Sequence, residues 1–124
     1  MGVLQLKSAD ILRSKLVTPG WQPIEVVKVS FEPAKSDGGA SMNHVLDHEI
    51  SEGEFAGVPL RDWISEKAAG TGMAYLKGCG FKIPDKGGDF NLDQTIGKKL
   101  MAHVETKEFG GRFMNTVTDY RPRG

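Results

Sequence analysis

The sequence predicts a mainly β protein of five short strands, with one helix between the third and the fourth strand. Three observations lead to this prediction. Runs of alternating apolar and polar residues recur along the chain, which is typical of half-buried strands. One stretch between them has apolar residues at helical spacing instead. Sixteen glycines and six prolines in 124 residues indicate many tight turns rather than a helical bundle.

The first half of the chain predicts a short helix and three strands. Ser8 is a candidate N-cap for a helix that ends before Pro19 and Gly20, because proline and glycine interrupt helices. Apolar and polar residues then alternate, and β-branched residues are frequent among them. This pattern predicts strands over residues 22–32, 42–50 and 58–65.

The second half predicts a helix and two more strands. Alanine, methionine and leucine at helical spacing favour a helix over residues 66–77, and residues 89–96 are expected to hold one helical turn. Alternation resumes in the last two predicted strands, 98–107 and 112–120. The predicted core contains Val27, Val29, Leu46, Leu60, Leu76, Leu100 and Val104.

Two similar turns separate strand-like runs, Glu54-Phe55-Ala56-Gly57 and Glu108-Phe109-Gly110-Gly111. Each has an aromatic residue followed by glycine, which suits a hairpin loop that needs a positive φ. We expect Gly57 and Gly111 to adopt that conformation, and Phe55 and Phe109 to plug the interior of the barrel.

The order of the elements favours one architecture. Three strands, a helix and two further strands form the layout of the OB-fold, a small Greek-key barrel, although an SH3-like barrel or a small sandwich also fits five short strands. The predicted fold is therefore a five-stranded OB-like barrel with a helix between strands 3 and 4. We expect an N-terminal segment with a short helix over residues 1–20, the barrel over 21–120 and a basic tail over 121–124.

Composition and charge limit the class of protein. With 39% hydrophobic and 26% charged residues, the chain suits one folded domain. It has no apolar run long enough to span a membrane and no apolar N-terminal stretch typical of a secretory signal, so we expect a cytoplasmic protein. The net charge is zero, but residues 21–66 carry a balance of −6 and residues 67–124 one of +4. The basic second half leaves room for a local cationic patch.

The residue types that carry chemistry form no catalytic pattern. His44 and His48 would share one face of a strand, but about 13 Å apart, too far to share a metal ion. Cys79 lies in a Gly-Cys-Gly turn without a base nearby in the sequence, which favours a packing role over a catalytic thiol. The glycine pairs match no phosphate-binding loop. We therefore expect a protein that is not an enzyme, with no catalytic residue, no metal and no cofactor.

Basic and aromatic residues are interleaved on the predicted strands. Proteins that bind single strands combine a cationic groove with flat rings that stack on bases. Arg61 and Trp63 are two positions apart and so point to the same face of an extended strand; Trp63 is either such a platform or a core residue. We expect the groove on strands 2 and 3 and loops 33–41 and 105–112. The candidate nucleic-acid-binding residues are Lys35, Arg61, Trp63, Lys107, Arg112 and Phe113.

Several motifs resemble those of short phage-encoded proteins from replication and recombination gene clusters. In the first half these are the entry Thr18-Pro19-Gly20-Trp21 and the turn Glu52-Gly53-Glu54-Phe55. In the second half they are Gly97-Lys98 and the hairpin from Glu108 to Asn115. The resemblance covers about residues 16–121. It implies an OB-type fold and single-stranded-DNA-binding-like function, and its motifs mark turns and strands rather than catalysis.

The resemblance and the candidate residues predict a phage-type single-stranded DNA-binding protein that coats and protects exposed strands during DNA replication or recombination. Expected partners are single-stranded DNA, phage recombinase or replication proteins, and further copies of the chain in a homo-oligomer or cooperative array. No membrane partner is expected. The alternative is a non-catalytic protein-interaction module that binds a phage or host protein through the acidic residues 43–66.

Overall fold

The protein is built on one five-stranded antiparallel sheet. The computed structural model describes residues 2–33, 38, 42–65 and 69–123. Each element predicted from the sequence is present, and the mainly β class is confirmed. The strand over 42–50 has the predicted bounds, other ends differ by up to a few residues, and residues 66–68 of the predicted helix lie outside the described residues. The elements are α1 (Ser8–Ser14), β1 (Gly20–Pro33), β2 (Met42–Ile50), β3 (Pro59–Ser65), α2 (Ala69–Gly78), the 3₁₀ turn η2 (Leu92–Thr95), β4 (Lys99–Phe109) and β5 (Arg112–Arg121).

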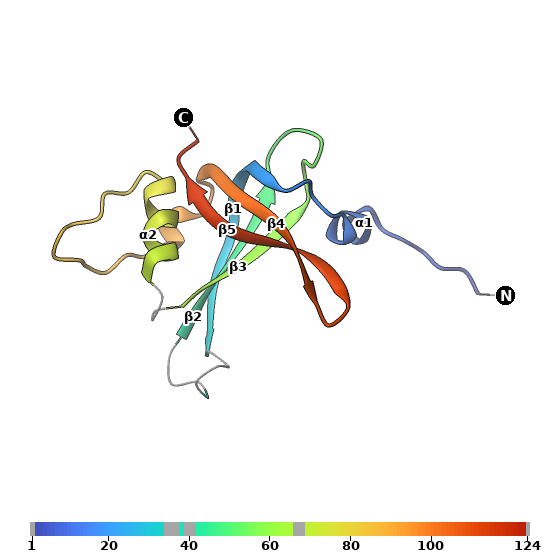
Figure 1. The fold of residues 1–124 in the computed structure, drawn as a ribbon, viewed down its shortest axis with the longest axis horizontal. Helices are drawn as coiled ribbons and strands as arrows, with labels where there is room; N and C mark the ends of the chain where they lie inside the picture. The colour runs from blue at the N-terminus through green and yellow to red at the C-terminus, as the bar shows by residue number, and fades with distance from the viewer. Residues whose placement is uncertain (1, 34–37, 39–41, 66–68, 124) are drawn as a thin grey trace.

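The sheet is curled but open. Its strand order is β3-β2-β1-β4-β5, and the long strand β1 pairs with β2 along most of its length and with β4 at its start. Strands β3 and β5 are the two edges, and no ladder in the described part of the chain joins them, so the sheet is not closed into a barrel. Figure 1 shows α2 on one side of the sheet, with α1 and the tip of the β4–β5 hairpin on the other.

The core lies on one face of the sheet and beneath α2. Leu46, Leu60, Leu100 and Val104 are buried as predicted, whereas Val29 and Leu76 are half-buried at its margin. The buried apolar residues that complete this core are Val17, Ile24, Val26, Ile50, Val58, Ile64, Tyr75, Cys79, Ala102, Val117 and Tyr120.

The prediction that Val27 lies in the core is wrong, since this side chain is 49% exposed. The register of β1 against β2 shifts between Val26 and Lys28, and a bulge there places one extra residue in β1. Because the side-chain period of a strand is two, one extra residue moves the following side chains to the opposite face. Val26 therefore takes the core position before the bulge, and Val29 takes the next one after it.

Helix α2 bridges the two edges of the sheet by packing on β3 and β5. Its last residue, Gly78, lies so close to the sheet that a Cβ there would be 2.9 Å from Cδ1 of Leu100. The side chain of Tyr75 is fully buried, and its hydroxyl donates to Oγ1 of Thr95 in η2 at 2.6 Å. Glycine at the contact and a satisfied tyrosine hydroxyl thus allow the helix to sit directly on the core.

Both predicted turn glycines adopt the expected conformation, with φ of 89° at Gly57 and 82° at Gly111. The aromatic residues beside them behave differently from each other. Phe55 is half-buried and packs against the core. Phe109 is 55% exposed, so its predicted role as a plug of the barrel interior is wrong. It stands at the end of β4, next to the hairpin turn and beyond the part of β4 that pairs with β1.

Candidate functional site

A groove with a volume of about 1460 Å³ is open to solvent. Most of its lining comes from the N-terminal segment at Leu12–Leu16, from β2 and β3, and from the β4–β5 hairpin. On β3 the groove includes both the outward side chains of Arg61 and Trp63 and the edge of the core at Leu60 and Asp62. Four of the predicted site residues line it, namely Arg61, Trp63, Arg112 and Phe113. The structure thus gathers residues that are far apart in the sequence along one surface.

The alternation of β3 explains how two of these residues reach the groove. Leu60 and Ile64 are buried, whereas Arg61 and Trp63, which lie between them in the sequence, point outward. Trp63 is 48% exposed, so the hypothesis that it is a core residue is wrong. The predicted common face of Arg61 and Trp63 is confirmed, and both side chains lie on the groove.

The β4–β5 hairpin contributes the opposite wall. Arg112 and Phe113 are exposed and line the groove, together with Phe109 and Met114, which were not predicted as site residues. Lys107 is exposed on β4 opposite Met114, but it is not among the residues that line the groove. Lys35, the remaining predicted site residue, lies outside the described residues, as does most of the loop 33–41.

The N-terminal wall is fixed by one amide side chain. Asn115 on β5 accepts a hydrogen bond from the backbone N–H of Val17 at 2.9 Å, and its own NH₂ donates to the carbonyl of Lys15 at 2.9 Å. An amide has both a donor and an acceptor, so one side chain satisfies both backbone groups. This clamp places Leu12, Lys15 and Leu16 at the groove.

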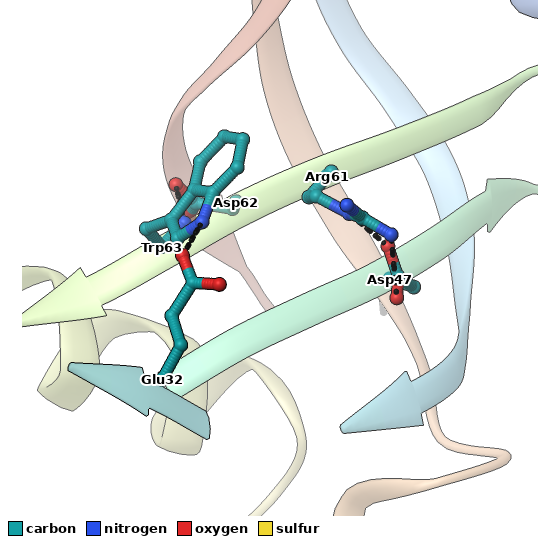
Figure 2. A network of polar contacts seen from close by, with 5 residues as sticks. All are labelled: Glu32, Asp47, Arg61, Asp62 and Trp63. Carbon is teal, nitrogen blue, oxygen red and sulfur yellow. Dashed lines mark hydrogen bonds and ion pairs between the residues drawn. The ribbon is translucent and has the colours of Figure 1, made fainter. Parts of the chain in front are cut away.

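Carboxylates contact both predicted site residues of β3 (Figure 2). Asp47 on β2 lies directly opposite Arg61 on β3. Its carboxylate accepts hydrogen bonds from Nε of Arg61 at 2.7 Å and from Nη2 at 3.4 Å. Hydrogen bonding to Asp47 raises the pKa of the Arg61 guanidinium. Glu32 at the end of β1 accepts a hydrogen bond from the indole Nε1 of Trp63 at 3.0 Å. Neither acid was predicted from the sequence, because only the arrangement of the strands reveals that they face these partners.

The charges of the groove balance. Three basic side chains, Lys15, Arg61 and Arg112, line it together with the acids Asp47, Glu49 and Asp62. Apolar and aromatic side chains, such as Leu12, Trp63 and Phe113, line it as well. The surface therefore combines flat rings and guanidinium groups with carboxylates, rather than presenting a purely cationic channel.

A second polar cluster lies on the core-facing side of β3, where His48 and Tyr120 are buried and Asp62 is half-buried at the edge of the groove. Tyr120 Oη donates to Asp62 Oδ2 at 2.8 Å and lies 2.9 Å from His48 Nε2. Because a hydroxyl has one proton, which goes to Asp62, the Nε2–H of a neutral His48 donates to the same oxygen. His48 Nδ1 then carries no proton, and it is buried without a partner.

Burial changes the acid–base behaviour of this cluster. Desolvation lowers the pKa of His48 to about 4, against the smaller opposing effect of Asp47. Desolvation raises the pKa of Asp62, although the hydrogen bonds from Tyr120 and from the backbone of Trp63 oppose it. At neutral pH, His48 is thus an uncharged core residue. The described residues contain no group of three side chains suited to hold a metal ion.

Cys79 has the properties of a packing residue. Its side chain belongs to the core cluster at the end of α2, and burial raises the pKa of the thiol to about 11. A nucleophilic cysteine needs the opposite shift, because the thiolate is the reactive form.

The sequence matches no protein-family model, and it matches no curated protein. The resemblance to phage single-strand-binding proteins therefore stays a prediction. No helix in the described ranges is long and apolar enough to cross a membrane.

Proposed function

We propose that this protein binds single-stranded DNA in the groove lined by β2, β3 and the β4–β5 hairpin. One observation carries the proposal: two aromatic rings and two guanidinium groups, Trp63, Phe113, Arg61 and Arg112, line the same groove. Rings that stack on bases contribute roughly 1–3 kcal/mol per base, and cations beside them neutralise phosphates. The protein would coat exposed strands during phage replication or recombination in the cytoplasm, as an oligomer or a cooperative array alongside replication or recombinase proteins.

The topology supports an OB-type assignment of the sheet. Strand β1 is central and pairs with both β2 and β4, and helix α2 lies between β3 and β4 in the sequence. This arrangement suits an OB-like barrel that is partly open. The side-chain bond between Tyr120 and Asp62 spans the opening between β5 and β3. OB-folds bind oligonucleotides on the face of strands 2 and 3 and at the loop between strands 4 and 5, which is where the groove lies.

A second candidate function is protein binding by the same groove. The balance of −6 over residues 21–66 and the carboxylates on the groove favour it, because like charges repel phosphates. Under this alternative, a basic partner segment would meet Asp47 and Glu49, and the aromatic residues would pack against its apolar side chains.

Titration with oligo-dT at two salt concentrations, followed by tryptophan fluorescence, distinguishes the two functions. The chain has two tryptophans, and Trp21 lies against Arg121 and His103. Trp21→Phe therefore leaves Trp63 as the single reporter on the groove. Quenching that weakens steeply with salt supports single-strand binding. Absence of binding at low salt contradicts it and favours the protein partner.

A further inference from the structure

Two acids hold the groups that single-strand binding would use. Asp47 accepts two hydrogen bonds from Arg61, and Glu32 accepts one from the indole of Trp63. Figure 2 shows these two pairs side by side, one across β2 and β3 and the other reaching β3 from the end of β1. The acids are thus placed where a ligand would meet the guanidinium and the ring.

A phosphate that approaches Arg61 must compete with Asp47. The Arg61–Asp47 ion pair is solvent-accessible, with side-chain exposures of 58% and 24%, and exposed ion pairs contribute little net free energy. A phosphate therefore gains little by replacing Asp47, and it is also repelled by the carboxylate that it displaces. Binding through phosphates alone is disfavoured at this position.

An unpaired base meets the same acids differently. The Watson–Crick edge of each DNA base carries at least one N–H group, such as N3–H of thymine or the exocyclic amine of cytosine, and in a single strand this edge is free to donate. A carboxylate oxygen is a strong acceptor for such a donor. In a duplex these N–H groups are used in pairing, and the outer surface is dominated by phosphates.

We infer that Asp47 and Glu32 are specificity-determining residues that make the groove reject duplex DNA and other polyanions while admitting single strands. The inference rests on the proposed function and names the repulsive element in it. Selective sites commonly combine such a repulsive element with attractive contacts. It also gives a role to the acidic character of residues 21–66, which otherwise opposes nucleic-acid binding.

The test compares three ligands with the wild type and three variants. The ligands are labelled oligo-dT, a hairpin duplex of the same nucleotide number and inorganic polyphosphate. Asp47→Asn removes one negative charge that lines the groove, and Glu32→Gln removes one beside it, at the contact with Trp63. Asp89→Asn is the matched control, because Asp89 is exposed in the segment between α2 and η2, outside the groove, and its change alters the net charge equally. Fluorescence anisotropy at low salt gives the affinities, and thermal melts verify that each variant folds.

We expect Asp47→Asn and Glu32→Gln each to raise the affinity for duplex and polyphosphate about threefold. This is the effect of removing one repulsive charge at roughly 6 Å from a phosphate in water. The affinity for oligo-dT should rise less. Asp89→Asn should leave the preference unchanged. If one groove variant fails to fold, the other carries the test.

The inference is overturned if the affinities for all three ligands change equally, or if Asp89→Asn changes them as much as the groove variants do. In either case, oligo-dT binding by the wild type still supports the proposed function. Weaker oligo-dT binding by both groove variants also overturns it, since the acids would then position the binding groups instead of repelling phosphate. If neither the wild type nor the variants bind any of the ligands, both the inference and the proposed function fail.

Discussion

The hydroxyl of Tyr120 on β5 donates a hydrogen bond of 2.8 Å to the carboxylate of Asp62 on β3, and so joins the two edges of the open sheet. Within the described residues no backbone ladder connects these edges. The same hydroxyl oxygen lies 2.9 Å from Nε2 of His48 on β2. One buried side chain therefore satisfies two polar partners at the place where a closed barrel would have its last ladder.

Tyr120→Phe should lower the free energy of unfolding by about 1–3 kcal/mol, because it leaves Asp62 and His48 without their buried partner. Urea unfolding followed by circular dichroism measures the change. Thr118→Ala is the control on the same strand, since its hydroxyl bonds to His103 at an exposed position and its loss should cost less than about 0.5 kcal/mol. Equal stability of Tyr120→Phe and the wild type would contradict a stabilising role for the Tyr120 bonds.

The buried histidine predicts a loss of stability in mild acid. The pKa of His48 is about 4 in the folded protein, against 6.5 for an ordinary histidine. Between about pH 6.5 and pH 4 the unfolded chain thus binds more protons than the folded one. The free energy of unfolding should fall as the pH is lowered through this range, by up to about 1.4 kcal/mol per pH unit. The contribution of His48 is complete above pH 6.5.

His48→Gln separates this effect from that of Asp62. The raised pKa of Asp62 acts in the opposite direction, because the folded protein then holds a proton that the unfolded chain has released. Glutamine retains a donor for Tyr120 and does not titrate. Unfolding curves at pH 7, 6, 5 and 4 should show a smaller acid-induced loss in the variant. Parallel curves for both proteins would assign the loss to other groups.

The sequence predicted the element order because strand alternation and helical spacing are local properties. The core was less predictable, since the bulge after Val26 changes which residues of β1 face inward. The pattern Val27, Val29 and Phe31 is an apolar alternation, but Val27 lies in the bulge and Phe31 lies near the exposed end of the strand. A bulge depends on the pairing of β1 with β2, which the alternation alone does not encode.

The turn glycines give a test of backbone conformation. Gly57→Val and Gly111→Val should each lower the free energy of unfolding by about 1 kcal/mol or more, because a β-branched residue tolerates positive φ poorly. Gly57→Val should be the more damaging, since a Cβ there would lie 3.3 Å from Cδ1 of Leu12, whereas open space surrounds Gly111. Thermal melts rank the two variants.

Gly70→Ala is the matched control for these glycine substitutions. Gly70 lies exposed in α2, its φ is not positive, and a Cβ there would meet nothing within 4 Å. Alanine should raise the free energy of unfolding by about 0.5–1 kcal/mol by restricting the unfolded chain. If all three substitutions had the same sign, positive φ would not explain the losses at Gly57 and Gly111.

The candidate site was predictable only where its residues lie close together in the sequence. The two-residue spacing of Arg61 and Trp63 was sufficient to place both on one face of β3. The hairpin residues Phe109 and Met114 were missed, because their exposure depends on β4 and β5 extending beyond the rest of the sheet. Asp47 was missed because its contact with Arg61 follows from strand register, which a single sequence does not display.

Variants of the groove test the site residue by residue. Trp63→Ala should weaken oligo-dT binding by roughly 1–3 kcal/mol with little change in salt dependence, because stacking releases no counterions. It should cost less stability than the roughly 3–5 kcal/mol of a core tryptophan, since the ring is half-exposed.

Arg112→Ala should lower the salt slope by about 0.7, the value for one phosphate contact on a single strand. Lys107→Ala on the same hairpin should change the slope less, because Lys107 does not line the groove. A larger change of the salt slope for Lys107→Ala than for Arg112→Ala would place the bound DNA strand outside the groove. A folded Trp63→Ala protein that binds oligo-dT as tightly as the wild type would show that Trp63 is not part of the site.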